Sequence, residues 1–122
     1  MQKFYFTPRS YLNIEEIYHL SKISWGPKTA DQYIEGLYKT FAIIAKNPEL
    51  GNLRKLRSEP FLIYPSRKHF IVYERISHGI VIITILHQAR NIERIIRDFG
   101  SDFAEEIKEI TGKNYESNGH KH

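Results

Sequence analysis

The chain has no cysteine among its 122 residues, so disulfide bonds and thiolate chemistry are both excluded. No apolar run approaches the roughly 18 residues that a membrane-spanning helix needs. Residues 1–6 also lack the apolar segment and small-residue cleavage site of a secretory signal. We therefore expect a cytoplasmic protein without a membrane partner, and the length suits one domain with one core.

Signatures of metals and cofactors are missing as well. Six histidines are present, but no two of them have the i, i+4 spacing of a zinc-binding helix. The sequence has no glycine-rich phosphate loop, and its serines lack the strand–turn–helix context of a nucleophile. We therefore expect neither a metal nor a cofactor.

Positive charge is concentrated in the middle of the chain, although the net charge is only +4. Residues 51–100 contain nine Lys/Arg against four Asp/Glu, whereas residues 101–122 contain three against five. A basic region of this kind favours an anionic partner, either nucleic acid or an acidic protein surface. A solvated basic face without any partner is the alternative.

The first half of the chain reads as a strand followed by a helical hairpin. Residues 3–7 are rich in aromatics and predict a short strand, and Thr7-Pro8 is a typical helix start. This helix should stop before Trp25, because Gly26 and Pro27 follow. Apolar residues at helical spacing then predict a second helix over residues 30–45, which Asn47-Pro48 ends.

The second half contains three clear strand patterns. Residues 61–64 form an apolar run that Pro65 should end, near an edge of the sheet. Residues 69–75 and 80–87 pair naturally through a glycine-containing hairpin. Residues 80–86 are apolar with almost no alternation, so this strand should be covered on both faces or lie centrally.

These elements predict an α+β domain with the helices on one side of a three- to four-stranded antiparallel sheet. Asp102 and Glu105 resemble a capping box, so a helical C-terminal extension should follow over residues 100–111. We expect residues 1–99 to form the main domain. The polar residues 112–122 should be a disordered tail.

One set of basic and titratable residues has chemical potential. Its members are Arg54, Arg57, Arg67, Lys68, His69, Tyr73, His87 and Arg90. RNA cleavage without a metal needs an acid, a base and a cation beside the phosphate, and His87 with Arg67 and Arg90 is able to supply such groups. Antiparallel pairing would bring His87 close to Arg67. No carboxylate base is evident beside them, and a histidine at a strand end more often bonds backbone or water.

Several segments resemble one known protein family in their order and spacing. They are "TPRSYLNIEEIYHL" in the first helix, "WG" at 25–26, "YIEGLYKTFAIIAKNPELG" up to residue 51, "LRKLR", "PSRKHFIVYE" from 65 to 74, and "ILHQARNIERI" from 85 to 95. Together they resemble the ParE branch of the RelE/ParE superfamily, the toxins of type II toxin–antitoxin modules. The superfamily fold, a helical hairpin on an antiparallel sheet, agrees with the fold expected from the residues alone.

The resemblance implies a function that composition does not give. ParE-like toxins poison DNA gyrase and block replication, and each is neutralised by a cognate antitoxin. The resemblance therefore implies a protein toxin without catalytic residues, which binds its antitoxin or target through Arg54, Arg57, Arg67, Lys68, Tyr73, His87 and Arg90. RelE-like relatives instead cleave mRNA on the ribosome, and in that alternative Arg67, His87 and Arg90 would form the site. A non-toxic interaction module is the third interpretation.

Overall fold

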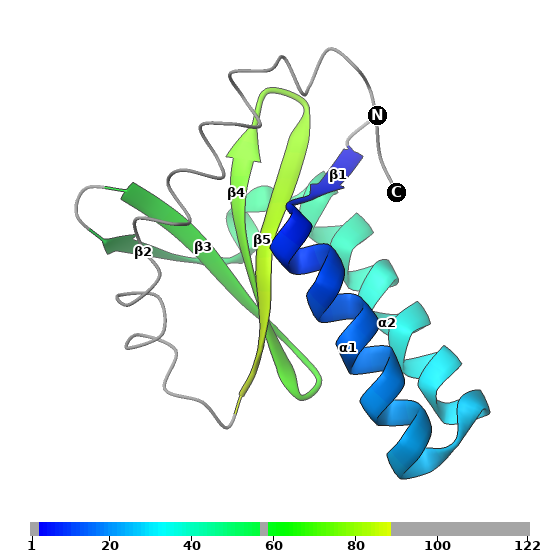
Figure 1. Ribbon diagram of the computed structural model, residues 1–122. Helices are drawn as coiled ribbons and strands as arrows, with labels where there is room; N and C mark the ends of the chain where they lie inside the picture. The colour runs from blue at the N-terminus through cyan, green and yellow to red at the C-terminus, as the bar shows by residue number, and fades with distance from the viewer. Residues whose placement is uncertain (1–2, 57–58, 89–122) are drawn as a thin grey trace.

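The computed structural model describes residues 3–56 and 59–88, and it has two helices on one face of a five-stranded sheet (Figure 1). The elements follow one another as β1 (Lys3–Phe6), α1 (Pro8–Trp25), α2 (Pro27–Lys46), the short 3-10 helix η1 (Pro48–Leu50), β2 (Asn52–Leu56), β3 (Glu59–Ser66), β4 (His69–Ile76) and β5 (Gly79–His87). The predicted α+β class is confirmed. The predicted extension over 100–111 and the tail over 112–122 lie outside the described residues.

The two helices begin and end at the signals seen in the sequence. Thr7 caps α1 by accepting a hydrogen bond from the backbone N–H of Ser10, and Pro8 occupies the first helical position. Gly26, at φ +93°, separates the helices, and α2 starts at once with Pro27. The first helix was expected to stop before Trp25, but it includes that residue, because the Gly26 N–H still bonds to the Lys22 carbonyl.

The sheet is mixed, with the strand order β1-β5-β4-β3-β2. Strands β2 to β5 pair antiparallel in succession, and the predicted hairpin of residues 69–75 and 80–87 is the β4–β5 pair. The N-terminal strand joins them as a fifth member and runs parallel to β5, with Lys3 opposite Gly79. No turn connects these two strands, so no local pattern in the sequence could show this pairing.

Two strand boundaries differ from the prediction. The basic stretch after Gly51 was not assigned to a strand, yet it forms β2 at the outer edge of the sheet. Strand β3 does not end at Pro65 but continues to Ser66. Because β2 pairs only with residues 59–63 of β3, Pro65 has a strand on one side alone, and its missing N–H leaves no gap in the β2 ladder.

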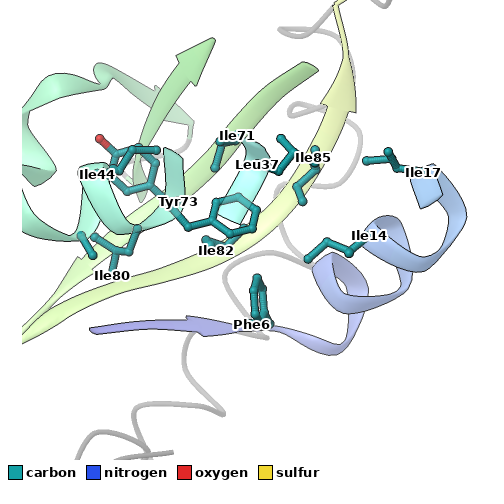
Figure 2. Packing of buried hydrophobic residues seen from close by; sticks show 12 residues of the cluster. Phe6, Ile14, Ile17, Leu37, Ile44, Ile71, Tyr73, Ile80, Ile82 and Ile85 are labelled. Atoms are coloured by element: carbon teal, nitrogen blue, oxygen red, sulfur yellow. The ribbon is translucent and has the colours of Figure 1, made fainter. Parts of the chain in front are cut away.

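The main core fills the space between the helices and the sheet (Figure 2). The ring of Phe41 is central to it, with ring centroids 5.3 to 5.6 Å from those of Phe4, Phe6 and Tyr38. The helices and strands contribute buried residues to this cluster together, namely Phe6, Ile14, Ile17, Leu37, Phe41, Ile44, Ala45, Ile71, Tyr73, Ile80, Ile82 and Ile85. The helical hairpin is thereby fixed relative to the strand ends that carry the candidate site.

Strand β5 is buried on both faces, which confirms the interpretation of its unbroken apolar run. Residues Gly79 to Leu86 are all buried. On the face away from the main core, Ile83 and Leu86 pack with Phe61, Ile63 and Val72. A bulge between Val72 and Tyr73 leaves Ile83 without a direct partner in the β4–β5 register.

The start of α1 and its N-cap form hydrogen bonds with the backbone of β5 beyond the end of β1. The hydroxyl of Thr7 donates to the Ile83 carbonyl at 2.7 Å, next to the bond from the Thr7 N–H to the Ile82 carbonyl. Further along, the side-chain oxygen of Asn13 accepts from the Ile85 N–H at 3.0 Å and from the Thr84 hydroxyl at 2.7 Å. The side chains of the N-cap Thr7 and of Asn13 in α1 thus take the place of a neighbouring strand at this edge.

Candidate functional site

The candidate site begins at the two-residue turn between β3 and β4, which consists of Arg67 and Lys68. Arg67 has φ +56°, and it is the one non-glycine residue of the ranges 3–56 and 59–88 with a positive φ. Gln88 holds the turn in place. Its side-chain amide donates to the Arg67 and His69 carbonyls, both at 3.0 Å, and its backbone N–H donates to the Lys68 carbonyl at 2.8 Å. The left-handed residue is therefore fixed by bonds from the far end of β5.

His69 and His87 face each other across the β4–β5 pair. They are direct partners in the strand register, and their ring centroids are 5.2 Å apart at an angle of 76° between the ring planes. His69 is partly buried, whereas His87 is exposed. The expectation that a hairpin would bring His87 beside the Arg67 end of the neighbouring strand is confirmed.

Tyr33 of α2 connects the turn to the histidine pair. Its hydroxyl lies 2.6 Å from Nδ1 of His69 and accepts a hydrogen bond from the Lys68 N–H at 3.2 Å. With the Lys68 N–H donating to this oxygen, a hydroxyl proton pointing to Nδ1 would give the tyrosine both a donor and an acceptor bond, and the ring of a neutral His69 would then carry its proton on Nε2. Burial raises the pKa of Tyr33, so this hydroxyl keeps its proton at neutral pH.

The environment of His69 favours the neutral ring. Burial lowers the pKa of His69 from 6.5 to about 4, and the charges of His87 and Lys68 act in the same direction. His69 thus holds the site together as a neutral acceptor at physiological pH.

Stability should fall on mild acidification because of His69. In the unfolded chain a histidine binds a proton below about pH 6.5, whereas the folded His69 does so only near pH 4. The free energy of unfolding is therefore retained above pH 6.5 and is lost as the pH falls toward 4. Between pH 7 and pH 5 we expect a loss of roughly 1 kcal/mol, because the ring is partly screened by solvent.

Urea unfolding at pH 7 and at pH 5 checks this pH dependence. The variant His69→Gln should show a smaller loss than the unmodified chain, while His19→Gln, on the exposed face of α1, should show the same loss as the unmodified chain. An equal loss in all three proteins would contradict the assignment to His69.

Both cations of the turn lie over aromatic rings. The guanidinium carbon of Arg67 is 5.6 Å from the centre of the Tyr33 ring, and the ammonium of Lys68 is 4.8 Å from the centre of the Trp25 ring. Arg67 also contacts Gly36 of α2 so closely that a Cβ at that position would overlap the guanidinium. The glycine therefore makes room for Arg67, which binds the turn to the helical hairpin.

A cavity of about 120 Å³ lies beneath Lys68, between the end of α1 and the ends of β4 and β5. Its residues are Ile17, Leu20, Ser21, Ser24, Trp25, Tyr33, Lys68, His69 and His87. It adjoins a second hollow of about 200 Å³ between α1 and β5, which shares Ile17, Leu20, His69 and His87 and includes Glu16. The two form a groove that we call the α1–β5 groove.

The structure brings together only part of the set predicted from the sequence. Arg67, Lys68, His69 and His87 meet at one end of the sheet. Arg54 lies in β2 opposite Phe61 of β3, six residues or about 20 Å along the strand from the turn. Arg57 and Arg90 lie outside the described residues.

Tyr73 does not lie with the other predicted site residues, because its side chain is in the core at 0 % exposure. Its hydroxyl donates to the Pro48 carbonyl at 2.6 Å and accepts from the Gly51 N–H at 2.8 Å. Burial raises the pKa of this hydroxyl. Tyr73 therefore ties the turn around η1 to β4 and offers no surface to a partner.

Three residues of the site were not singled out from the sequence, namely Trp25, Tyr33 and Gln88. Tyr33 belongs to the apolar stripe of α2, and its contact with His69 joins positions 36 residues apart. Trp25 was assigned to the end of a helix. The available signals were that Trp25 is the single tryptophan of the chain, that it precedes a Gly-Pro break and that it belongs to the "WG" segment of the resemblance.

The described residues offer hydrogen bonding and positive charge to a ligand. Within the ranges 3–56 and 59–88, no group of three or more His, Cys, Asp or Glu side chains is placed to hold a metal ion. None of the helices described there is both long and apolar enough to cross a membrane. The positively charged turn and the half-apolar groove are suited to recognition of an anionic, partly apolar surface.

Comparisons with known proteins point to one family. The sequence model of the family described as "ParE toxin of type II toxin-antitoxin system, parDE" matches residues 4–92. The Toxin ParE1 of Caulobacter vibrioides is 26% identical over 91 residues, which are 75% of this chain and 94% of that protein. The fold is similar to a solved chain of the chromosomal ParDE TA system from P. aeruginosa, with a TM-score of 0.61 and 13% identity over 71% of this chain and 96% of the other.

Proposed function

Because the chain belongs to the ParE toxin family of type II toxin–antitoxin systems, we propose that it inhibits DNA gyrase, blocks replication and is neutralised by a cognate antitoxin. The match of the family over residues 4–92 carries this proposal. It spans both helices, the sheet and the candidate site. The relative from P. aeruginosa is described as part of a ParDE system, which supports an antitoxin as the partner.

In this proposal the toxin acts by binding and not by catalysis, in the cytoplasm. Arg67 is engaged with Tyr33 and Gly36, and His69 is bonded to Tyr33, so both side chains serve the architecture of the turn. Neither is placed as a free acid, base or phosphate clamp. A rigid turn with exposed positive charge suits recognition of a protein partner.

The proposed binding surface consists of the β3–β4 turn and the α1–β5 groove. Among the described residues we assign partner binding to Lys68, His87 and the exposed part of Arg67. Arg54, Arg57 and Arg90 are kept as proposed binding residues on the basis of the sequence alone. Residues 1–99 are proposed as the toxin domain, with residues 100–111 as a helical extension and 112–122 as its tail.

A gyrase assay with the purified chain tests the proposal. We expect inhibition of supercoiling with accumulation of cleaved DNA, and relief of both effects by the antitoxin encoded next to this chain. The His87→Ala variant should retain most of the inhibition, because a few anchor residues, typically Trp, Tyr or Arg, carry most of the binding energy of a protein interface, and His87 is an exposed residue without a catalytic role in this proposal. Unchanged gyrase activity in the presence of the toxin would contradict the proposal.

The alternative function is ribosome-dependent cleavage of mRNA, and the paired histidines beside Tyr33 and two cations favour it over other enzyme classes. The same preparation should therefore be tested on translating ribosomes. Cleaved mRNA that disappears in His87→Ala would place the protein on the nuclease branch. In that case Arg67, His87 and Arg90 would be the site residues.

A further inference from the structure

The lining of the 120 Å³ cavity combines apolar and polar side chains. Helix α1 contributes Ile17, Leu20 and Trp25 together with Ser21 and Ser24, and Tyr33, Lys68 and the two histidines complete the lining. Leu20 and Trp25 at the rim are 56% and 52% exposed, although Ile17 beside them is buried. Large apolar side chains are thus left bare where the cavity opens, next to a cation.

The size of the cavity limits what it is able to accept. A dry protein cavity of about 150 Å³ binds benzene, so about 120 Å³ is suited to one small ring or one branched aliphatic side chain. The cavity opens toward Trp25 and Lys68, where a shallower hollow lined by Trp25, Thr29, Tyr33, Arg67 and Lys68 adjoins it. A longer ligand is able to continue across this hollow.

The charges around the opening define the second half of the ligand. Lys68 lies over one face of the Trp25 ring, and Arg67 lies over Tyr33, so both cations flank the mouth of the cavity. Glu16 lines the opposite end of the α1–β5 groove. A carboxylate at the Lys68 end complements this arrangement, whereas a carboxylate at the Glu16 end would be repelled.

We propose that this cavity is an anchor site for the antitoxin, and that it takes one aromatic or branched aliphatic side chain followed by a carboxylate that binds Lys68. The proposal rests on the proposed function in naming the antitoxin as the partner. It adds the position of the anchor, the size of the side chain and the charge that must stand beside it.

The site is built before the partner arrives. Tyr33 holds both the Lys68 backbone and His69, and Gln88 fixes the turn by bonds to the carbonyls of residues 67 and 69. The backbone that positions Lys68 therefore loses little conformational freedom on binding. A short peptide should bind measurably without the rest of the antitoxin.

Blocked dipeptides test the anchor directly. The probes are phenylalanyl-glutamate, phenylalanyl-glutamine and alanyl-glutamate, each acetylated and amidated, added to the full chain labelled with ¹⁵N. Trp25 is the single tryptophan, so its indole N–H gives one NMR signal that reports on the cavity alone. We expect saturable shifts of that signal with phenylalanyl-glutamate, at least fivefold weaker binding of the glutamine probe and no saturation with alanyl-glutamate.

Charge variants locate the carboxylate. Lys68→Gln should reduce the affinity for phenylalanyl-glutamate to that for phenylalanyl-glutamine, and Leu20→Ala should weaken both phenylalanyl probes. Lys22→Gln is the matched control, because it removes the same charge from the exposed face of α1, where Lys22 lies over Tyr18 instead of lining the cavity. Lys68 is exposed, so its variant should fold normally, and the NMR spectrum verifies this.

Each part of the proposal has its own contradicting result. Equal binding of the glutamate and glutamine probes would show that Lys68 does not bind a carboxylate here. An indole signal of Trp25 that shifts with none of the probes would show that the cavity does not take an anchoring side chain. If the antitoxin encoded beside this chain binds Lys68→Gln and Leu20→Ala as tightly as the unmodified chain, the antitoxin is not the occupant. None of these measurements uses gyrase, so a failure of the gyrase proposal is detected separately.

Discussion

Replacing Gly79 by alanine should lower the free energy of unfolding by about 3 to 5 kcal/mol. A Cβ at Gly79 would overlap the carbonyl group and the amide nitrogen of Lys3, which are backbone atoms and cannot rotate away. Lys3 and Gly79 are the first pair of the β1–β5 ladder, so β1 would have to move off the sheet. That movement would also disturb Phe4 and Phe6, which pack on the central Phe41 ring.

The control for this prediction is Gly26→Ala. Gly26 has φ +93°, but a Cβ there would meet no atom within 4 Å. Its ψ of 163° places it in a backbone region that is nearly restricted to glycine, so its substitution should cost only that backbone strain, about 1 to 3 kcal/mol. Urea unfolding of both variants, followed by circular dichroism, measures the difference. If Gly79→Ala is no more destabilising than Gly26→Ala, the close approach of Lys3 is not a constraint on the fold.

The second large effect is expected for Thr7→Val, which keeps the shape of the side chain and removes its hydroxyl. Thr7 is fully buried, and its Oγ1 both donates to the Ile83 carbonyl and accepts from the Ser10 N–H. The substitution removes the cap of α1 and leaves a buried carbonyl without this donor. We expect a loss of about 2 to 4 kcal/mol in the free energy of unfolding.

Thr40→Val is the matched control for the loss of a threonine hydroxyl. The Thr40 hydroxyl bonds to the Gly36 carbonyl one turn earlier in α2 and lies 3.1 Å from the Ser66 hydroxyl. Thr40 is only half-buried, and a helix-interior carbonyl already accepts a backbone bond, so the cost should stay near 1 kcal/mol or below. Similar unfolding midpoints for the two variants would show that Thr7 does not join α1 to β5 as described.

The helical hairpin was predictable from the sequence because its signals are local. Thr7-Pro8 marks the start of α1, and Gly26-Pro27 separates the helices within a few residues. The β4–β5 hairpin was predictable for the same reason, since its turn and its apolar strands adjoin in the sequence. Local geometry then determined that His69 and His87 would meet.

The pairing of β1 and the continuation of β3 past Pro65 were not predictable in this way. Both depend on which strand lies beside which, and that is settled by contacts between distant segments. The same limit applied to the site. Tyr33 and Trp25 looked like ordinary apolar residues of helices, and only the packing of the hairpin on the sheet brings them to Lys68 and His69.

For Tyr73, the sequence suggested a role at the surface that the structure does not support. A tyrosine among basic residues on a strand suggested a binding surface, but its position on the inner face of β4 directs it into the core. Strand periodicity alone did not reveal this, because β4 has apolar residues on both faces. The inner face became evident only when the helices were seen to cover it (Figure 2).

The parallel pairing of Lys3 with Gly79 also orders events during synthesis. The first strand and both helices are synthesised before any residue of β5, so their apolar faces lack the central strand of the sheet until then. At roughly 5 to 20 residues per second, this interval lasts several seconds. The sheet is therefore completed late, and the apolar faces of the helical hairpin are exposed to aggregation and proteolysis until β5 has been made.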